Sequence, residues 1–136
     1  GWNKLYGKNG FSQYQFVIPE ENSKSALDEI LRVLKEDKFM PRLCVLKTFG
    51  KIPSLGHLSF PLKGTTLAMD FPNNILKNKN LFRKFDEIVI KSGGKVYPAK
   101  DSLMDKVTFQ NSYNNLHKFK KYKDTNISSD FWERVS

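Results

Sequence analysis

The chain has 136 residues, of which 39% are hydrophobic and 27% charged, and this composition predicts one folded domain and excludes a disordered segment. No apolar run approaches the ~18 residues that a membrane span needs, and no signal-peptide pattern is found, so we expect a cytoplasmic protein, with membrane association left open. Cys44 is the only cysteine, which excludes an internal disulfide and a cysteine-based zinc site. The net charge of +9 favours anionic partners, although the abundant lysine and asparagine fit a biased genome composition equally well.

The first half of the chain predicts a strand, a helix and a second strand. Residues 11–18 alternate between two sets of side chains, as a half-buried strand does. A helix is expected over residues 25–37, because Ser25 begins a capping pattern and apolar residues then recur at helical spacing. Residues 43–49 are rich in apolar and branched side chains and predict a strand in which Cys44 is a buried, unreactive residue.

The second half repeats this order. A loop rich in proline and glycine follows, with a short strand expected near residues 58–60. Residues 65–71 predict a third main strand, residues 78–92 a second amphipathic helix that Gly93-Gly94 ends, and residues 95–97 a short fourth strand. Leucine and aromatic residues at helical spacing predict one or two additional short C-terminal helices. The order β-α-β-β-α-β is typical of an α+β, ferredoxin-like fold, in which two helices cover one face of an antiparallel sheet.

Strand alternation divides the side chains between two sheet faces. The apolar face is expected to pack beneath the helices and comprises Tyr14, Phe16, Ile18, Cys44, Leu46, Leu67, Met69 and Phe71. The other face collects Gln13, Gln15, Leu43, Val45, Lys47, Phe49, Thr66, Ala68 and Asp70, and Lys100 follows just beyond the fourth strand. Lys47 among apolar neighbours indicates a solvated cleft or an anionic partner, or else a strand end in bulk water. The two glutamines suit the hydroxyl groups of a ligand, although purely structural glutamines on an exposed sheet are commoner.

Two kinds of site are disfavoured. A basic ferredoxin-like sheet can bind single-stranded RNA, but that mode needs aromatic side chains on the uncovered face, and the aromatic residues at 14, 16 and 71 belong to the helix-covered one. No nucleic acid is therefore expected. His57 and His117 lack ligand partners at metal spacing, so no metal site is expected.

Four short segments carry a resemblance to a known family. They are Gln-Tyr-Gln-Phe-Val-Ile-Pro (13–19), Val-Leu-Lys-Thr-Phe-Gly (45–50), Leu-Ala-Met-Asp-Phe-Pro (67–72) and Gly-Gly-Lys-Val-Tyr-Pro-Ala-Lys-Asp-Ser (93–102). Over nearly its whole length the chain resembles the C-terminal substrate or cap domain of FAD-linked oxidases of the decaprenylphosphoryl-β-D-ribose 2-oxidase type, within the vanillyl-alcohol-oxidase-like superfamily. In that family an N-terminal domain binds FAD and the domain similar to this chain covers the isoalloxazine ring. The resemblance implies an FAD-dependent oxidoreductase that oxidises a secondary hydroxyl of a sugar, such as C2 of a polyprenyl-phosphoryl pentose, by hydride transfer to flavin N5.

The resemblance also implies roles for individual residues. Lys100 would be the catalytic residue, next to the flavin and the oxidisable hydroxyl, where its charge would stabilise the anionic reduced flavin. Gln15 would contact both the flavin and the substrate. The other substrate-binding residues would be Gln13, Leu43, Val45, Lys47, Phe49, Thr66 and Ala68. Asn114 and residues 124–127 depart from the family pattern, which leaves the contacts of the tail open.

The chain has no glycine-rich phosphate loop and no histidine motif for covalent flavin attachment. We therefore expect residues 1–136 to be a single C-terminal domain of a larger enzyme, inactive alone and binding FAD weakly or not at all. Its partners would be the N-terminal FAD-binding domain of the same polypeptide, a sugar or sugar-phosphate substrate, and a short-chain reductase that consumes the keto sugar. The alternative is a stand-alone ferredoxin-like module that binds an anionic small molecule or RNA without catalysis.

Overall fold

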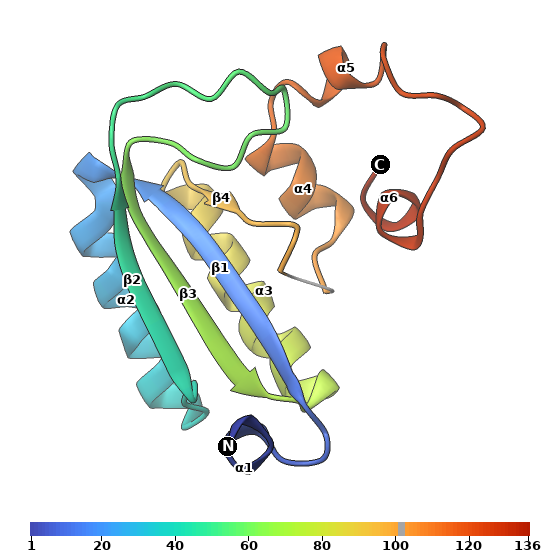
Figure 1. Cartoon of the computed structure of the whole chain (residues 1–136). Coiled ribbons are helices and arrows are strands. Elements are labelled where there is room, and N and C mark those ends of the chain that lie inside the picture. The colour runs from blue at the N-terminus through green and yellow to red at the C-terminus, as the bar shows by residue number, and fades with distance from the viewer. Residues whose placement is uncertain (101–102) are drawn as a thin grey trace.

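The computed structural model describes residues 1–100 and 103–136, apart from the side chain of Trp2. Asp101 and Ser102, which end the fourth segment of the resemblance, lie outside the described residues. In chain order the elements are α1 (Trp2–Tyr6), β1 (Phe11–Pro19), the 3-10 turn η1 (Glu20–Asn22), α2 (Ser23–Asp37), β2 (Leu43–Phe49), β3 (Gly64–Pro72), α3 (Ile75–Lys91), β4 (Lys95–Val96), α4 (Lys106–Ser112), α5 (Leu116–Phe119) and α6 (Asp130–Val135) (Figure 1).

The four strands form one antiparallel sheet in the order β2-β3-β1-β4. Helices α2 and α3 lie side by side on one face of this sheet, and α4 to α6 extend beyond its β4 edge (Figure 1). The predicted α+β class is confirmed, and the element and strand orders are compatible with the ferredoxin-like fold. None of the described helices is long and apolar enough to cross a membrane.

The core lies between the sheet and the two long helices. Tyr14, Phe16 and Ile18 of β1 are fully buried, and they pack against the apolar faces of α2 and α3. Each such side chain stabilises the fold by about 1.5–3 kcal/mol relative to an exposed one. Gly94, which follows α3, lets the backbone pass close to β1, because a Cβ atom at this position would lie 2.5 Å from the carbonyl oxygen of Val17.

Strand β2 differs from the prediction. Cys44 and Leu46 were expected in the core, but Cys44 is exposed and Leu46 is 62% exposed. The reason is that β2 is an edge strand, whereas α2 packs on β1 and α3 packs on β1 and β4. Alternation assigned both residues to the helix side correctly, but the helices do not cover that side as far as the edge.

Both helix starts were also placed too late. Helix α2 begins at Ser23, directly after η1, and the hydroxyl of Ser25 donates to the carbonyl oxygen of Asn22, so Ser25 is not a cap. Helix α3 begins at Ile75, three residues before the predicted start, because the side chain of Asn74 accepts a hydrogen bond from the backbone N–H of Lys77.

Three smaller predictions need correction. The strand expected near residues 58–60 does not form, and these residues lie in the β2–β3 loop. Helix α1 was not predicted, since a helix of five residues carries little periodicity. The tail contains three short helices, α4, α5 and α6, where one or two were expected.

Candidate functional site

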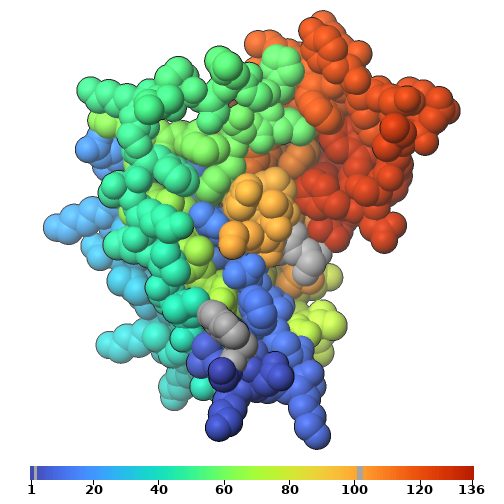
Figure 2. Space-filling view, in the orientation of Figure 1, coloured from blue at the N-terminus to red at the C-terminus, as the bar shows by residue number. Residues whose placement is uncertain are grey.

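The sheet face opposite α2 and α3, called the open face below, brings most of the predicted site residues into three rows. Strand register places Leu43, Asp70 and Gln13 in the first row, Val45, Ala68 and Gln15 in the second, and Lys47, Thr66 and Val17 in the third. Directly paired residues of antiparallel strands share a face, so seven of the predicted side chains lie in one continuous area. Figure 2 views this face, with β2 in teal and β1 in blue.

These seven side chains differ in exposure. Leu43, Val45 and Lys47 on the edge strand are exposed, and Gln13 and Ala68 are half-buried. Gln15 and Thr66 are buried, and Nε2 of Gln15 donates to Oγ1 of Thr66 at 3.1 Å. Thr66 is only 1% exposed, so its hydroxyl contacts the amide of Gln15 and not solvent.

The first row ends in a buried acid. Asp70 is 6% exposed, and its Oδ1 accepts a hydrogen bond from Nε2 of Gln13 at 2.8 Å. Its Oδ2 accepts from the hydroxyl of Tyr6 at 2.6 Å, so helix α1 closes this end of the sheet. The hydrogen bond to Asp70, together with burial and the negative charge, raises the pKa of Tyr6 to about 12.

The opposite end of the open face is closed by the β2–β3 loop. Phe60 of this loop stacks on Tyr97, with ring centroids 4.6 Å apart, and Phe49 meets Phe60 edge-on at 6.0 Å. Nζ of Lys95 donates to the carbonyl oxygen of Ser59 at 3.0 Å, and burial lowers the pKa of Lys95. Phe49 thus lies in an aromatic wall at the end of the face.

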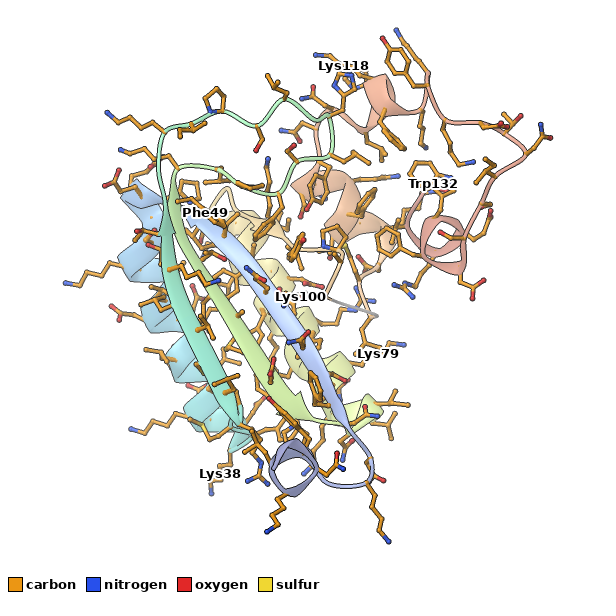
Figure 3. The ribbon with its side chains drawn as sticks, viewed as in Figure 1. Lys38, Phe49, Lys79, Lys100, Lys118 and Trp132 are labelled. Carbon is orange, nitrogen blue, oxygen red and sulfur yellow. The ribbon has the colours of Figure 1, made fainter. Side chains whose placement is uncertain are left out.

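Lys100 lies in the turn after β4. The backbone N–H of Tyr97 donates to the carbonyl oxygen of Gln15 at 2.8 Å, and the backbone N–H of Lys100 contacts the carbonyl oxygen of Tyr97 at 3.4 Å. The side chain of Lys100 is exposed, and Figure 3 shows it alongside β1 in the view onto the open face. The strand register does not extend to Lys100, so its link to the rows runs through Tyr97 and Gln15.

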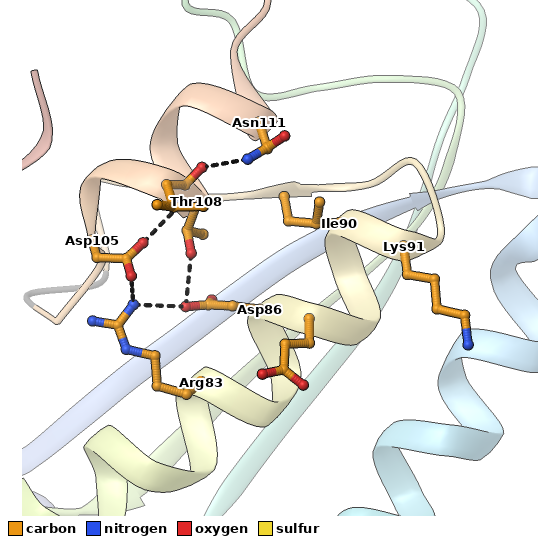
Figure 4. A pocket seen from close by; sticks show the side chains of 9 residues that line it. Arg83, Asp86, Ile90, Lys91, Asp105, Thr108 and Asn111 are labelled. Atoms are coloured by element: carbon orange, nitrogen blue, oxygen red, sulfur yellow. Dashed lines mark hydrogen bonds and ion pairs between the residues drawn. The ribbon is translucent and has the colours of Figure 1, made fainter.

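A separate cavity of about 470 Å³ lies between α3 and α4 (Figure 4). Its polar lining includes Arg83, Asp86, Asp105 and Thr108, which bind one another: Asp86 accepts from the hydroxyl of Thr108 at 3.1 Å, and Arg83 pairs with Asp105. This cavity is on the helix side of the sheet and contains none of the predicted site residues. Because it lies away from the open face, the cavity does not form part of the candidate site.

No metal centre is found in the part of the chain that the structure describes, where no group of three or more histidine, cysteine, aspartate or glutamate side chains lies close enough to hold an ion. Among the described residues, Lys47, Lys95 and Asp70 are charged groups of the open face, and Lys100 lies in the turn beside it. The face can therefore supply ammonium groups, amides and an apolar strip to a ligand.

Most of this chain is similar to a known enzyme. The chain is 35% identical over 112 residues to decaprenylphosphoryl-beta-D-ribose oxidase of Mycolicibacterium smegmatis strain ATCC 700084 / mc(2)155. The resemblance found in the sequence is confirmed. The matched region covers 82% of this chain and 24% of that oxidase, so the chain spans about a quarter of the relative's length, consistent with a C-terminal domain of that enzyme type. No protein-family model matches the chain.

Sequence reasoning missed part of the site. Tyr6 and Tyr97 were not proposed as site residues, and Asp70 was placed on the correct face without a role. Alternation had placed Gln13 and Asp70 on the same face, but it does not give the register between strands that brings them into contact. The contact of Tyr6 with Asp70 spans 64 positions and had no local signal.

Proposed function

We propose that this chain is the substrate-binding cap domain of an FAD-dependent oxidoreductase that oxidises a secondary hydroxyl of a sugar, such as C2 of a polyprenyl-phosphoryl pentose. The observation that carries the proposal combines a sequence similarity with the placement of the predicted site residues. The chain is similar to an oxidase named for such a substrate, and seven of the residues singled out by that resemblance gather on the sheet face opposite α2 and α3.

The open face has the properties that a cap over a flavin and a sugar requires. Val45 and Ala68 offer a flat apolar strip that suits one side of a planar ring, and Gln13 and Gln15 flank it with amides. Lys47 and Lys100 are exposed ammonium groups that suit a phosphate and an electron-rich ring edge.

These residues fit FAD, provided that another domain holds most of the cofactor. FAD, when bound, supplies the hydride acceptor for the oxidation. The chain's own residues bind and orient the sugar. The amides of Gln13 and Gln15 form hydrogen bonds with its hydroxyl groups, and Lys47 pairs with an anionic group. Lys100 provides positive charge where negative charge develops during the oxidation.

The first test is the visible absorption spectrum of the complete gene product. A protein with bound flavin whose absorption bleaches when a sugar substrate is added supports the proposal. A colourless protein that does not bind added FAD contradicts it and favours the alternative, a non-catalytic ferredoxin-like module for an anionic small molecule or RNA.

Lys100→Met provides the residue-level test. We expect flavin reduction by substrate to fall by about 100-fold or more, because one preorganised charge at the reacting centre is worth this much. Stopped-flow bleaching of the flavin measures the rate, and Lys118→Met in the tail removes the same charge at an exposed position away from the sheet (Figure 3). A normal rate in Lys100→Met removes Lys100 from the site.

A further inference from the structure

The amide of Gln13 has only one orientation that its surroundings allow. An ionised carboxylate accepts hydrogen bonds and donates none, so the group of Gln13 that faces Oδ1 of Asp70 at 2.8 Å is its NH2 group. Tyr6 donates its hydroxyl hydrogen to the other carboxylate oxygen, Oδ2, at 2.6 Å. Both oxygens of Asp70 thus accept a hydrogen bond, and the carboxylate cannot turn away from Gln13 without breaking one of these two bonds.

The NH2 group of Gln15 also points into the sheet one row further on, but the hydroxyl of Thr66 can donate as well as accept and does not impose this orientation as a carboxylate does. Nε2 of Gln15 donates to Oγ1 of Thr66 at 3.1 Å, and Thr66 is buried. In both glutamines the NH2 group is therefore engaged within the sheet, and the carbonyl oxygen Oε1 remains as the second polar atom of each amide.

Both Oε1 atoms are open acceptors. Among the residues that the structure describes, only Asn78 has a buried side-chain oxygen or nitrogen without a hydrogen-bond partner. The Oε1 atoms of Gln13 and Gln15 have no partner within the described part of the chain, so they reach solvent. Residues two positions apart on a strand are about 7 Å apart on the same face, which is close enough for one small ligand to reach both.

The face also has a charge gradient. Asp70 carries negative charge in the first row, whereas Lys47 lies in the third row, four positions along the sheet and about 13 Å away. A phosphate brought to the first row would meet the carboxylate of Asp70 and the acceptor Oε1 of Gln13, neither of which binds an anion. Hydroxyl groups would find acceptors there, and an anionic group would find the ammonium group of Lys47 towards the third row.

We propose that Asp70, supported by Tyr6, is a positioning residue that fixes the amide of Gln13, so that the open face presents two hydrogen-bond acceptors to the hydroxyl groups of a polyol ligand. The ligand then lies with its hydroxyl groups over the first two rows and its anionic group towards Lys47. This inference rests on the proposed sugar-binding function and specifies how the same face selects the hydroxyl-bearing end.

The test compares two probes of equal charge, ribose 5-phosphate and 2-deoxyribose 5-phosphate, on the complete gene product. We expect the wild type to bind ribose 5-phosphate more tightly, as measured by calorimetry. In Asp70→Asn, the amide of Gln13 is free to turn over, so affinity for ribose 5-phosphate should fall about 5- to 10-fold, the worth of one hydrogen bond, and the preference should vanish. Asp28→Asn, an exposed acid on α2, changes the charge equally and should leave both affinities unchanged.

Two further measurements keep the test decisive. The side-chain amide resonances of Gln13 in a nitrogen-proton NMR spectrum should shift in Asp70→Asn and, to a smaller extent, in Tyr6→Phe. If Asp70→Asn does not fold, Gln13→Met removes the acceptor at similar volume and should erase the same preference. Any of three results overturns the inference. The Gln13 resonances do not shift, the wild type binds neither probe or binds both equally, or the preference for ribose 5-phosphate survives the substitutions.

The outcomes separate this inference from the proposed function. If sugar reduces the bound flavin but the Asp70→Asn variant keeps the preference for ribose 5-phosphate, the proposed function stands and the inference about Asp70 is wrong. If the protein binds no flavin but prefers ribose 5-phosphate, and Asp70→Asn removes that preference, the inference about Asp70 stands and the proposed flavoenzyme function is wrong.

Discussion

At the scale of single residues, buried carboxylates fix the geometry on both sides of the sheet. Asp70 does so on the open face, and Asp86 of α3 does so on the helix side. Asp86 is 6% exposed, and its two oxygens accept from the hydroxyl groups of Tyr14 at 2.8 Å and Thr108 at 3.1 Å. This one side chain therefore joins α3 to β1 and to α4, and α4 follows the turn that carries Lys100.

Asp86→Ala should cost about 3 kcal/mol of the free energy of unfolding, because it removes the acceptor of two buried hydroxyl groups. Urea unfolding followed by circular dichroism measures the change. Glu87→Ala is the matched control, since Glu87 is the next residue on α3 and is exposed, and its effect should stay within about 0.5 kcal/mol. Equal effects of the two substitutions would contradict a structural role for Asp86.

Periodicity predicted which way a side chain faces better than it predicted what covers it. Gln13, Gln15, Lys47 and Thr66 were placed on one face from alternation alone, and the register confirms that placement. Burial was harder, because it depends on elements distant in sequence: Gln15 of β1 contacts Thr66 of β3, and helix α1 at the N-terminus reaches Asp70 of β3.

At the scale of elements, β2 is the least covered part of the sheet. All of its residues except Phe49 are exposed, including Leu43 and Val45 on the open face and Leu46 on the helix side. A strand with apolar residues exposed on both faces is suited to contact another surface. Within the proposed function, that surface would be the flavin-binding domain.

Cys44 reports on the exposure of β2. We expect iodoacetamide to modify Cys44 in the folded chain, because the residue is exposed. Partial burial and, to a smaller extent, the charge of Asp70 raise the pKa of the thiol above its ordinary value of 9.0, and only the thiolate reacts. The rate should therefore be low at neutral pH and continue to rise above pH 9, as measured by mass spectrometry.

The urea-unfolded chain is the control for this experiment. Its thiol has an ordinary pKa, so it should react faster than the folded chain at neutral pH and level off at lower pH. Modification that requires unfolding at every pH would show that β2 is covered, which was the prediction from the sequence.

At the scale of the whole molecule, the C-terminal tail belongs to the same core as the sheet. Met104, Phe109, Tyr113, Leu116 and Val135 are all buried in one cluster with β1 and α3. The hydroxyl of Tyr113 donates to the carbonyl oxygen of Val96 in β4 at 2.9 Å, and Nε of Arg134 donates to the carbonyl oxygen of Met104 at 2.9 Å. These contacts hold both ends of the segment that contains Lys100, so its position depends on the tail.

Phe109→Ala tests whether the tail and the sheet unfold together. Phe109 is 1% exposed and contacts the rings of Tyr113 and Phe131, with centroids 5.0 and 5.5 Å away, so the substitution should cost about 3–5 kcal/mol. With Trp2 replaced by Phe in both proteins, fluorescence reports Trp132 in the tail, and far-ultraviolet circular dichroism reports mainly α2 and α3. We expect the fluorescence and circular dichroism transitions to coincide in urea and to shift by the same amount in Phe109→Ala. The reason is that unfolding of the tail alone would expose core residues such as Met104. A fluorescence transition that shifts alone would show that the tail is a separate unit, and the position of Lys100 would then not depend on it.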